Sequence, residues 1–168
     1  DVGHKLNVQG DHQYAFVLKA LKELQVIPVV ALDRKDHNDV VTQLKRDGVI
    51  ASATVAFRVE KADFEDFDAI KGQFGVNVND AFEEFDDIDL IFDCRLCIAL
   101  DVSDTAQEIA NFAKKFCDAY PVRRVIVTGS CIPPSIRDVL ATDENTTLLR
   151  RELEIIAKAR DLSVLELV

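Results

Sequence analysis

The chain has 168 residues, of which 48% are hydrophobic and 30% are charged, and its formal net charge is −10. That length can form one domain with its own hydrophobic core, and the composition is that of an ordinary globular protein. The negative charge repels phosphate backbones and anionic lipid, so we expect no nucleic-acid partner. No apolar run approaches the ~18 residues of a membrane span, and no signal segment opens the chain, so we expect a cytoplasmic protein outside the membrane.

Apolar residues recur at helical spacing in six segments along the chain, after a loop over the first ten residues. The helices are predicted at 11–24, 37–46, 63–74, 77–85, 104–120 and 147–160. Gly48 and Gly75 are predicted to end two of them, and Asn79 and Asp104 to cap two others. The last helix is predicted to bury a face formed by Leu149, Leu153 and Ile156.

Short apolar runs between these helices predict five strands. They are Ile27–Leu32, Ala53–Val59, Ile88–Arg95, Arg124–Thr128 and Ser163–Val168. The run from Ile88 is apolar enough to be buried on both faces, which is typical of parallel sheets covered by helices. Alternation of strand and helix predicts an α/β fold built from parallel βα repeats.

Two architectures fit these repeats: part of a TIM-like (β/α) barrel, or an open doubly wound sheet. A dinucleotide-binding sheet would show a Gly-x-Gly-x-x-Gly turn, and neither that pattern nor a Walker A motif is present. We therefore favour the barrel. Because the chain begins at Asp1 without any Met and stops at Val168 in an apolar run, we expect residues 1–168 to be a single domain that is a fragment of a longer barrel protein.

Charged and small polar residues gather at the carboxyl ends of the predicted strands, where ligands bind in such folds. The ligand-binding candidates are Asp33, Arg34, Arg58, Asp93, Arg95, Gly129 and Ser130. Arginines there would hold a small anionic ligand and carboxylates could act as acid or base. The alternative is that these charges simply pair with one another where strands meet solvent.

Arg58 is the most informative candidate, because it interrupts an apolar strand and a buried arginine needs a partner. We expect that partner to be Asp93 or Asp33, with Arg58 and Asp93 converging on one opening. Gly129-Ser130 resembles a phosphate-cradling turn, although Pro133-Pro134 favours a rigid connection instead.

No pattern in the chain predicts a metal or a cofactor. Cys94-x-x-Cys97 has redox or zinc spacing, but it ends a strand and no second ligand pair exists. We expect all four cysteines to be reduced, buried side chains. His4, His12 and His37 lie far apart in the sequence, so no catalytic triad can be argued from them.

Several short motifs, taken in order, resemble the beta protein family of phages and their satellites. They are Ile27–Arg34, Arg46-Asp47-Gly48, the strand with Arg58, Ile88–Asp93 and Gly129–Pro133. Family members are roughly twice as long as this chain. Some are encoded in prophage or satellite-phage modules of anti-phage defence, where the beta protein counteracts a lethal partner. The resemblance supplies no catalytic residues.

These observations lead to three hypotheses. The first is a binding or neutralising component of a phage-related defence or toxin–antitoxin module, with a protein partner from the same module. The second is a barrel-like enzyme acting on a phosphate- or carboxylate-bearing small molecule. The third is a barrel scaffold without activity.

Overall fold

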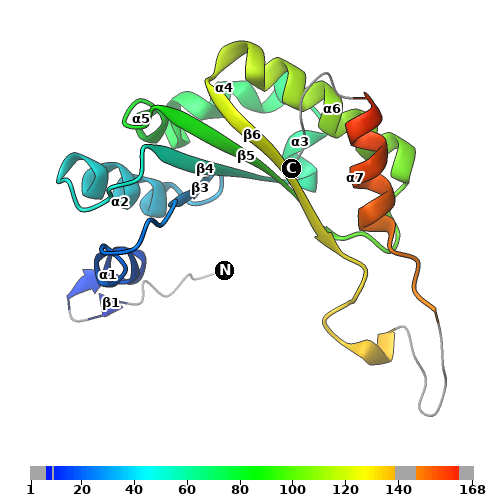
Figure 1. The fold of residues 1–168 in the computed structure, drawn as a ribbon, viewed down its shortest axis with the longest axis horizontal. Coiled ribbons are helices and arrows are strands. Elements are labelled where there is room, and N and C mark those ends of the chain that lie inside the picture. Colours follow the sequence, from blue (N-terminus) through cyan, green and yellow to red (C-terminus); the bar gives the residue numbers. More distant parts are fainter. Residues whose placement is uncertain (1–6, 9, 139–146, 163–168) are drawn as a thin grey trace. The chain divides into compact units, whose positions relative to one another are not determined.

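The structure is a computed structural model that describes residues 7–8, 10–138 and 147–162 (Figure 1). The chain divides into two compact units. The first comprises Asp1–Arg58 and Ile70–Asp89, and the second comprises Val59–Ala69 and Leu90–Val168. No helix among the described residues has the length and apolarity that a membrane span requires.

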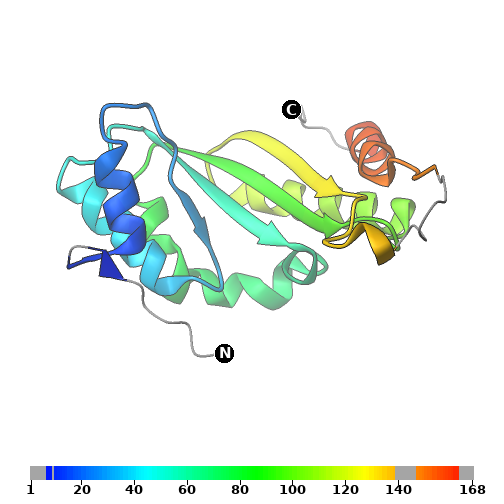
Figure 2. The ribbon, with the colours of Figure 1, turned by 90° about the horizontal axis from the view of Figure 1, so that it is seen from below.

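A four-stranded sheet in the order β3-β4-β5-β6 is the central element of the fold. Its strands are β3 (Val29–Ala31), β4 (Thr54–Glu60), β5 (Asp87–Leu96) and β6 (Val122–Ser130). The strands are parallel, and the register of β3 on β4 places Val29 beside Ala56 and Ala31 beside Arg58. The predicted parallel βα repeats are confirmed. Within the described residues the sheet is open (Figure 2).

The first unit starts with a two-stranded antiparallel pair, β1 (Asn7–Val8) and β2 (Asp11–His12). Helix α1 follows at Gln13–Ala20 and α2 at Lys35–Arg46. The prediction of a helix over 11–24 was therefore too long at both ends. His12 caps α1, because its Nδ1 accepts the backbone N–H of Tyr14 at 3.2 Å.

Within the part of the chain that the structure describes, side chains pair with the edge of β3 that faces away from β4. The hydroxyl of Tyr14 accepts the backbone N–H of Val29 at 2.9 Å and donates to its carbonyl at 3.2 Å. Two residues on, Asn38 does the same for Ala31: its Oδ1 accepts the N–H at 3.2 Å and its Nδ2 donates to the carbonyl at 2.7 Å. Both groups cover an edge that would otherwise offer unpaired donors and acceptors.

The segment predicted as one helix over 63–74 forms two. Helix α3 (Lys61–Phe64) begins at a capping box in which the Glu60 N–H donates to the Asp63 carboxylate at 3.1 Å. Helix α4 (Phe67–Asn77) then starts where Asp66 accepts the N–H of Asp68 at 2.9 Å. The predicted stop at Gly75 is wrong, because α4 continues two residues beyond it.

Helix α5 (Asn79–Phe82) completes the first unit, and its cap is Val78 rather than the predicted Asn79. The core of this unit is aromatic. Phe57 of β4 lies edge-on to Phe74 and Phe82, with ring centroids 5.6 and 5.2 Å apart. Phe57 and Phe74 are at most 1% exposed. The side of β4 that carries Phe57 therefore faces the helices.

The second unit contains the long helix α6 (Val102–Ala119) and α7 (Arg151–Leu162). Helix α6 starts two residues earlier than predicted. Its cap is Asp101, whose carboxylate accepts the N–H groups of Ser103 and Asp104 at 2.8 and 2.9 Å. Phe92 of β5 packs edge-on against Phe64 and Phe112 to form this unit's own aromatic core.

The face that α7 buries differs from the predicted one. Leu153 is 52% exposed, whereas Ile155 and Ala159 are fully buried. The buried side chain of Glu152 lies on the same face, where the Cys131 thiol donates to its carboxylate at 2.7 Å. The predicted face of Leu149, Leu153 and Ile156 is therefore wrong: Leu149 precedes the helix, and the buried face is one that also carries a polar side chain, Glu152. The predicted strand Ser163–Val168 lies outside the described residues.

Candidate functional site

The predicted ligand-binding residues fall into two groups, one in each unit. Arg34 and Arg58 line a cavity of about 470 Å³ in the first unit. The second group lines an open hollow of about 490 Å³ in the second unit and consists of Asp93, Arg95, Gly129 and Ser130. Asp33 lines neither. The predicted convergence of Arg58 and Asp93 on one opening stays a prediction, because the two residues belong to different units.

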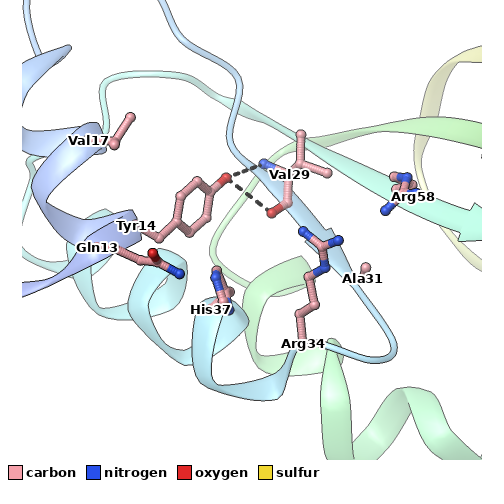
Figure 3. A pocket seen from close by; sticks show the side chains of 8 residues that line it. All are labelled: Gln13, Tyr14, Val17, Val29, Ala31, Arg34, His37 and Arg58. Carbon is pink, nitrogen blue, oxygen red and sulfur yellow. Dashed lines mark hydrogen bonds between the residues drawn. The ribbon is translucent and has the colours of Figure 1, made fainter. Parts of the chain in front are cut away.

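The cavity of the first unit is lined by side chains from α1, from β3 and β4, and from the start of α2 (Figure 3). Successive side chains of a strand point to opposite faces, so Arg58 projects away from the buried side of Phe57. The register of β3 on β4 sets Ala31 next to it. Helix α1 contributes the remaining wall, and the full lining is Gln13, Tyr14, Val17, Val29, Ala31, Arg34, His37 and Arg58.

Two aromatic groups of the cavity are held in fixed positions. Burial raises the pKa of the Tyr14 hydroxyl, which stays protonated and bonded to Val29. The ring of His37 lies 5.5 Å from that of Tyr14 and edge-on to His12 at 4.7 Å. Burial lowers the pKa of His37, and the charges of His12 and Arg34 lower it further. His37 is therefore neutral at pH 7 and can accept a proton.

The charge of this cavity is opposite to that of the whole chain. None of the described residues that line it carries a carboxylate, although the net charge of the protein is −10. Outside the lining, Asp33 has its Oδ1 3.6 Å from Nε of Arg34. Guanidinium groups bind carboxylates and phosphates through paired N–H donors. The cavity is thus suited to an anion, with Val17 and Val29 as apolar walls.

The hollow of the second unit combines charges of both signs. The Arg95 backbone N–H donates to Asp93 Oδ1 at 2.8 Å, and Nε of Arg95 lies 3.7 Å from Asp93 Oδ2. The Arg95 guanidinium also pairs with Glu60. Arg95 has a φ of +53°, a left-handed conformation that is uncommon for residues other than glycine and recurs at functional sites.

Strand β6 supplies the opposite wall of this hollow through Thr128, Gly129 and Ser130. The Ser130 hydroxyl accepts the N–H of Ile132 at 3.0 Å and donates to the Ile132 carbonyl at 3.2 Å. A side chain at Gly129 would collide with the Cys97 thiol and approach Cys94 Cβ to 3.2 Å. Glycine is required here because β6 passes this close to the turn that follows β5.

The cysteines beneath Gly129 show no sign of reactivity. Cys94, Cys97 and Cys131 are at most 3% exposed. Burial raises the pKa of the Cys94 thiol to about 12 and also raises that of Cys97, so both remain protonated thiols at neutral pH. Among the described residues no cluster of histidine, cysteine or acidic side chains has the geometry to hold a metal ion.

Sequence reasoning missed Tyr14 and His37 as residues of a candidate site. Tyr14 lies on a helix that precedes β3, and only the folding of α1 onto the β3 edge brings it to Val29. His37 was set aside because the three histidines are distant in sequence, yet His12 and His37 are in contact. Arg34 was predicted because it follows a strand. That rule could not have indicated Tyr14 or His37, because both lie on helices.

The protein is thus of the α/β class, with an open parallel sheet among the described residues and one polar hollow in each unit. The chain belongs to the Beta protein family, whose sequence model matches residues 3–166. Comparison with curated proteins and with solved structures gave no match.

Proposed function

We propose that this protein binds a small anionic molecule, bearing a phosphate or a carboxylate, in the cavity between α1 and the β3–β4 edge. The observation that carries the proposal is the presence of Arg34 and Arg58 in a cavity lined by no described carboxylate. In a protein of net charge −10, such a concentration of positive charge opposes the overall field. Guanidinium groups that line a cavity can hold a phosphate or a carboxylate through paired N–H donors.

We also propose that the sheet is part of a (β/α) barrel. A doubly wound sheet reverses its strand order at a switch point, whereas β3, β4, β5 and β6 follow one another in sequence order. Right-handed crossovers in one direction send every helix to the same face of the sheet, as in a barrel. The face that carries Arg58 would then point to the barrel interior, where ligands of such proteins bind at the strand ends.

An enzymatic role for the same cavity is supported by His37. Because the imidazole is neutral at pH 7 and lines the cavity beside Arg34, it can take a proton from a ligand whose negative charge the arginines hold. Tyr14 is less suited to proton transfer, because its hydroxyl already accepts the N–H of Val29 and donates to the Val29 carbonyl. The reaction would be a proton abstraction or a hydrolysis of a phosphate- or carboxylate-bearing small molecule.

A thermal-shift screen of the whole chain tests anion binding. Inorganic phosphate, pyrophosphate and citrate are suitable probes. A ligand at 100 times its dissociation constant adds about 2.7 kcal/mol to the free energy of unfolding, which raises the melting temperature by several degrees. We expect Arg58→Ala to lose the shift and Lys22→Ala, an exposed lysine of the same unit, to keep it. No shift with any anion, or equal shifts in both variants, contradicts the proposal.

A second candidate function is that of a cytoplasmic neutralising component in a phage-related defence or toxin–antitoxin module. Membership of the Beta protein family favours it, since the motif series resembles beta proteins that counteract a lethal partner. Co-expression with the toxic product of a neighbouring gene tests this role. If the Arg58→Ala variant still rescues growth, neutralisation does not require anion binding in the cavity. Failure to rescue together with no anion-induced shift would leave an inactive scaffold.

A further inference from the structure

We propose, building on the anion binding proposed above, that the anion in the cavity of the first unit carries an apolar group of the size of a phenyl ring, as an aryl phosphate does. The volume of the cavity, about 470 Å³, lies in the range of roughly 300–1,000 Å³ that is typical of sites for small organic molecules. A phosphate ion alone would fill only a small part of it. The walls of the cavity indicate what fills the rest.

Exposed apolar side chains from two different elements face this cavity. In the described part of the first unit, the exposed large apolar residues are Val17, Leu24, Val29 and Val76. Val17 of α1 is 46% exposed and Val29 of β3 is 38% exposed, and both line the cavity. Single exposed valines are common on protein surfaces, but two that line the same cavity form an apolar wall that a ligand can cover.

Tyr14 contributes its ring to that wall and not its hydroxyl. The hydroxyl accepts the Val29 N–H at 2.9 Å and donates to the Val29 carbonyl at 3.2 Å, so the backbone of β3 engages it in both roles. These bonds fix the ring between α1 and β3. An apolar group of the ligand would therefore meet the Tyr14 ring as well as the two valines, and aromatic rings pack favourably on one another.

The positive charge and the apolar wall lie at different ends of the cavity. In Figure 3, Arg34 and Val17 lie on opposite sides of the Tyr14 ring. The side chain of Arg34 is 49% exposed, and Asp33 approaches its Nε rather than the terminal nitrogens of the guanidinium. A ligand with its anionic group at Arg34 would therefore extend its remaining atoms along Tyr14 towards Val17.

Isothermal titration calorimetry on the whole chain tests the proposal with phenyl phosphate and methyl phosphate. At about pH 8 both monoesters are doubly charged, because the second pKa of such groups is about 6, so they differ in the apolar group alone. We expect phenyl phosphate to bind about tenfold more tightly, because its ring is removed from water. Its binding should also show the more negative heat-capacity change, which marks apolar burial.

Val17→Ser removes part of the apolar wall and leaves the arginines in place. Because Val17 is exposed, the variant should fold, and it should weaken phenyl phosphate about fivefold and methyl phosphate less than about twofold. Val76→Ser is the matched control: Val76 is a 67% exposed valine of α4 that does not line the cavity, so both affinities should be unchanged. Arg34→Gln should weaken both monoesters by a similar factor, because it changes the charge and not the wall.

Equal affinity for the two monoesters would overturn the proposal and leave anion binding intact. The proposal would also fail if Val17→Ser and Val76→Ser had the same effect on phenyl phosphate, or if Val17→Ser weakened both monoesters alike. Binding of neither monoester would contradict the anion binding proposed above, and the apolar group with it.

Discussion

The two units carry polar hollows of similar volume, about 470 and 490 Å³, but the hollows differ in charge. In the first unit Arg34, Arg58 and His37 face a cavity with no described carboxylate in its lining. In the second unit Arg95 is balanced by Asp93 and Glu60. Strand ends therefore do not form one uniform ring of charges. A lining with one sign of charge favours a ligand of the opposite sign, which is why the anion proposal concerns the first unit.

The units also differ in how they hold their strands. In the first unit, the side chains of Tyr14 and Asn38 pair with the backbone of β3. In the second unit the absence of a side chain at Gly129 lets β6 approach the Cys94–Cys97 turn. One unit depends on hydrogen bonds that a substitution can remove, and the other on space that a substitution can fill. Substitutions at these positions should separate the two cases.

The largest effect is expected for Asn38→Ala. Asn38 is 2% exposed, and besides its two bonds to Ala31 its Nδ2 donates to the Asn77 carbonyl at 2.7 Å. Removing the amide leaves buried backbone groups without partners, which should lower the free energy of unfolding by about 3 kcal/mol. Urea unfolding measures it. Asn111→Ala, at an exposed asparagine of α6, is the control and should change little. Equal effects of both variants would contradict the role given to Asn38.

A smaller loss, about 2 kcal/mol, is expected for Gly129→Ala, because the new methyl group must displace the buried Cys97 thiol. Adding Cys97→Ala should restore part of the loss, and a double-mutant cycle measures this coupling. Gly72→Ala is the matched control. It lies on an exposed turn of α4 with nothing within 4 Å of its new methyl group, so it should stabilise the protein by up to about 1 kcal/mol. Destabilisation by both substitutions would refute the steric argument.

Tyr14→Phe should cost about 1 kcal/mol, since water can replace the hydroxyl at this exposed edge. Its clearest consequence should be faster hydrogen exchange at the Val29 amide, which loses its acceptor. Tyr120→Phe removes a hydroxyl in the second unit, where the ring stacks on Phe116, and should leave exchange at Val29 unchanged. Unchanged exchange in Tyr14→Phe would show that the hydroxyl does not protect this edge.

Much of this fold could be predicted because the core repeats a simple pattern. The apolar runs around Phe57 and Phe92 are strands in the structure, and the helical periods between them are helices. Predicted helix boundaries were wrong where a single side-chain hydrogen bond sets the start of the helix, as at the Asp101 cap of α6 and at Asp66 before α4. A hydrophobic period carries no information about such bonds.

The candidate sites were only partly accessible to sequence reasoning for a related reason. Asp93 and Ser130 were predicted because each lies at the end of a strand, and both line one hollow. Tyr14 and His37 lie on helices, and their approach to β3 is a tertiary contact between segments that no local pattern joins. The order of the strands could be anticipated from the βα rhythm, whereas the docking of α1 against the edge could not.

The smallest effect concerns the pH dependence of the first unit. The pKa of His37 lies below its ordinary value of 6.5, because burial and the charges of His12 and Arg34 outweigh the opposing charges of Asp36 and Asp33. The unfolded chain therefore binds this proton more tightly. His37 contributes its full stability above pH 6.5, and that contribution is lost as the pH falls below it. Urea unfolding of His37→Asn should show a flatter pH profile over that window.

Anion binding should change with pH in the opposite direction, which distinguishes a role in the cavity from a role in stability alone. A protonated His37 adds positive charge beside Arg34 and Arg58, so the affinity for an anion should rise as the pH falls. Sulfate is the appropriate probe because its own charge does not change between pH 5 and 8. We expect this rise to disappear in His37→Asn while Lys22→Ala retains it. Sulfate affinity that is independent of pH in the unmodified protein would place His37 outside the binding site, even if the stability profile behaved as expected.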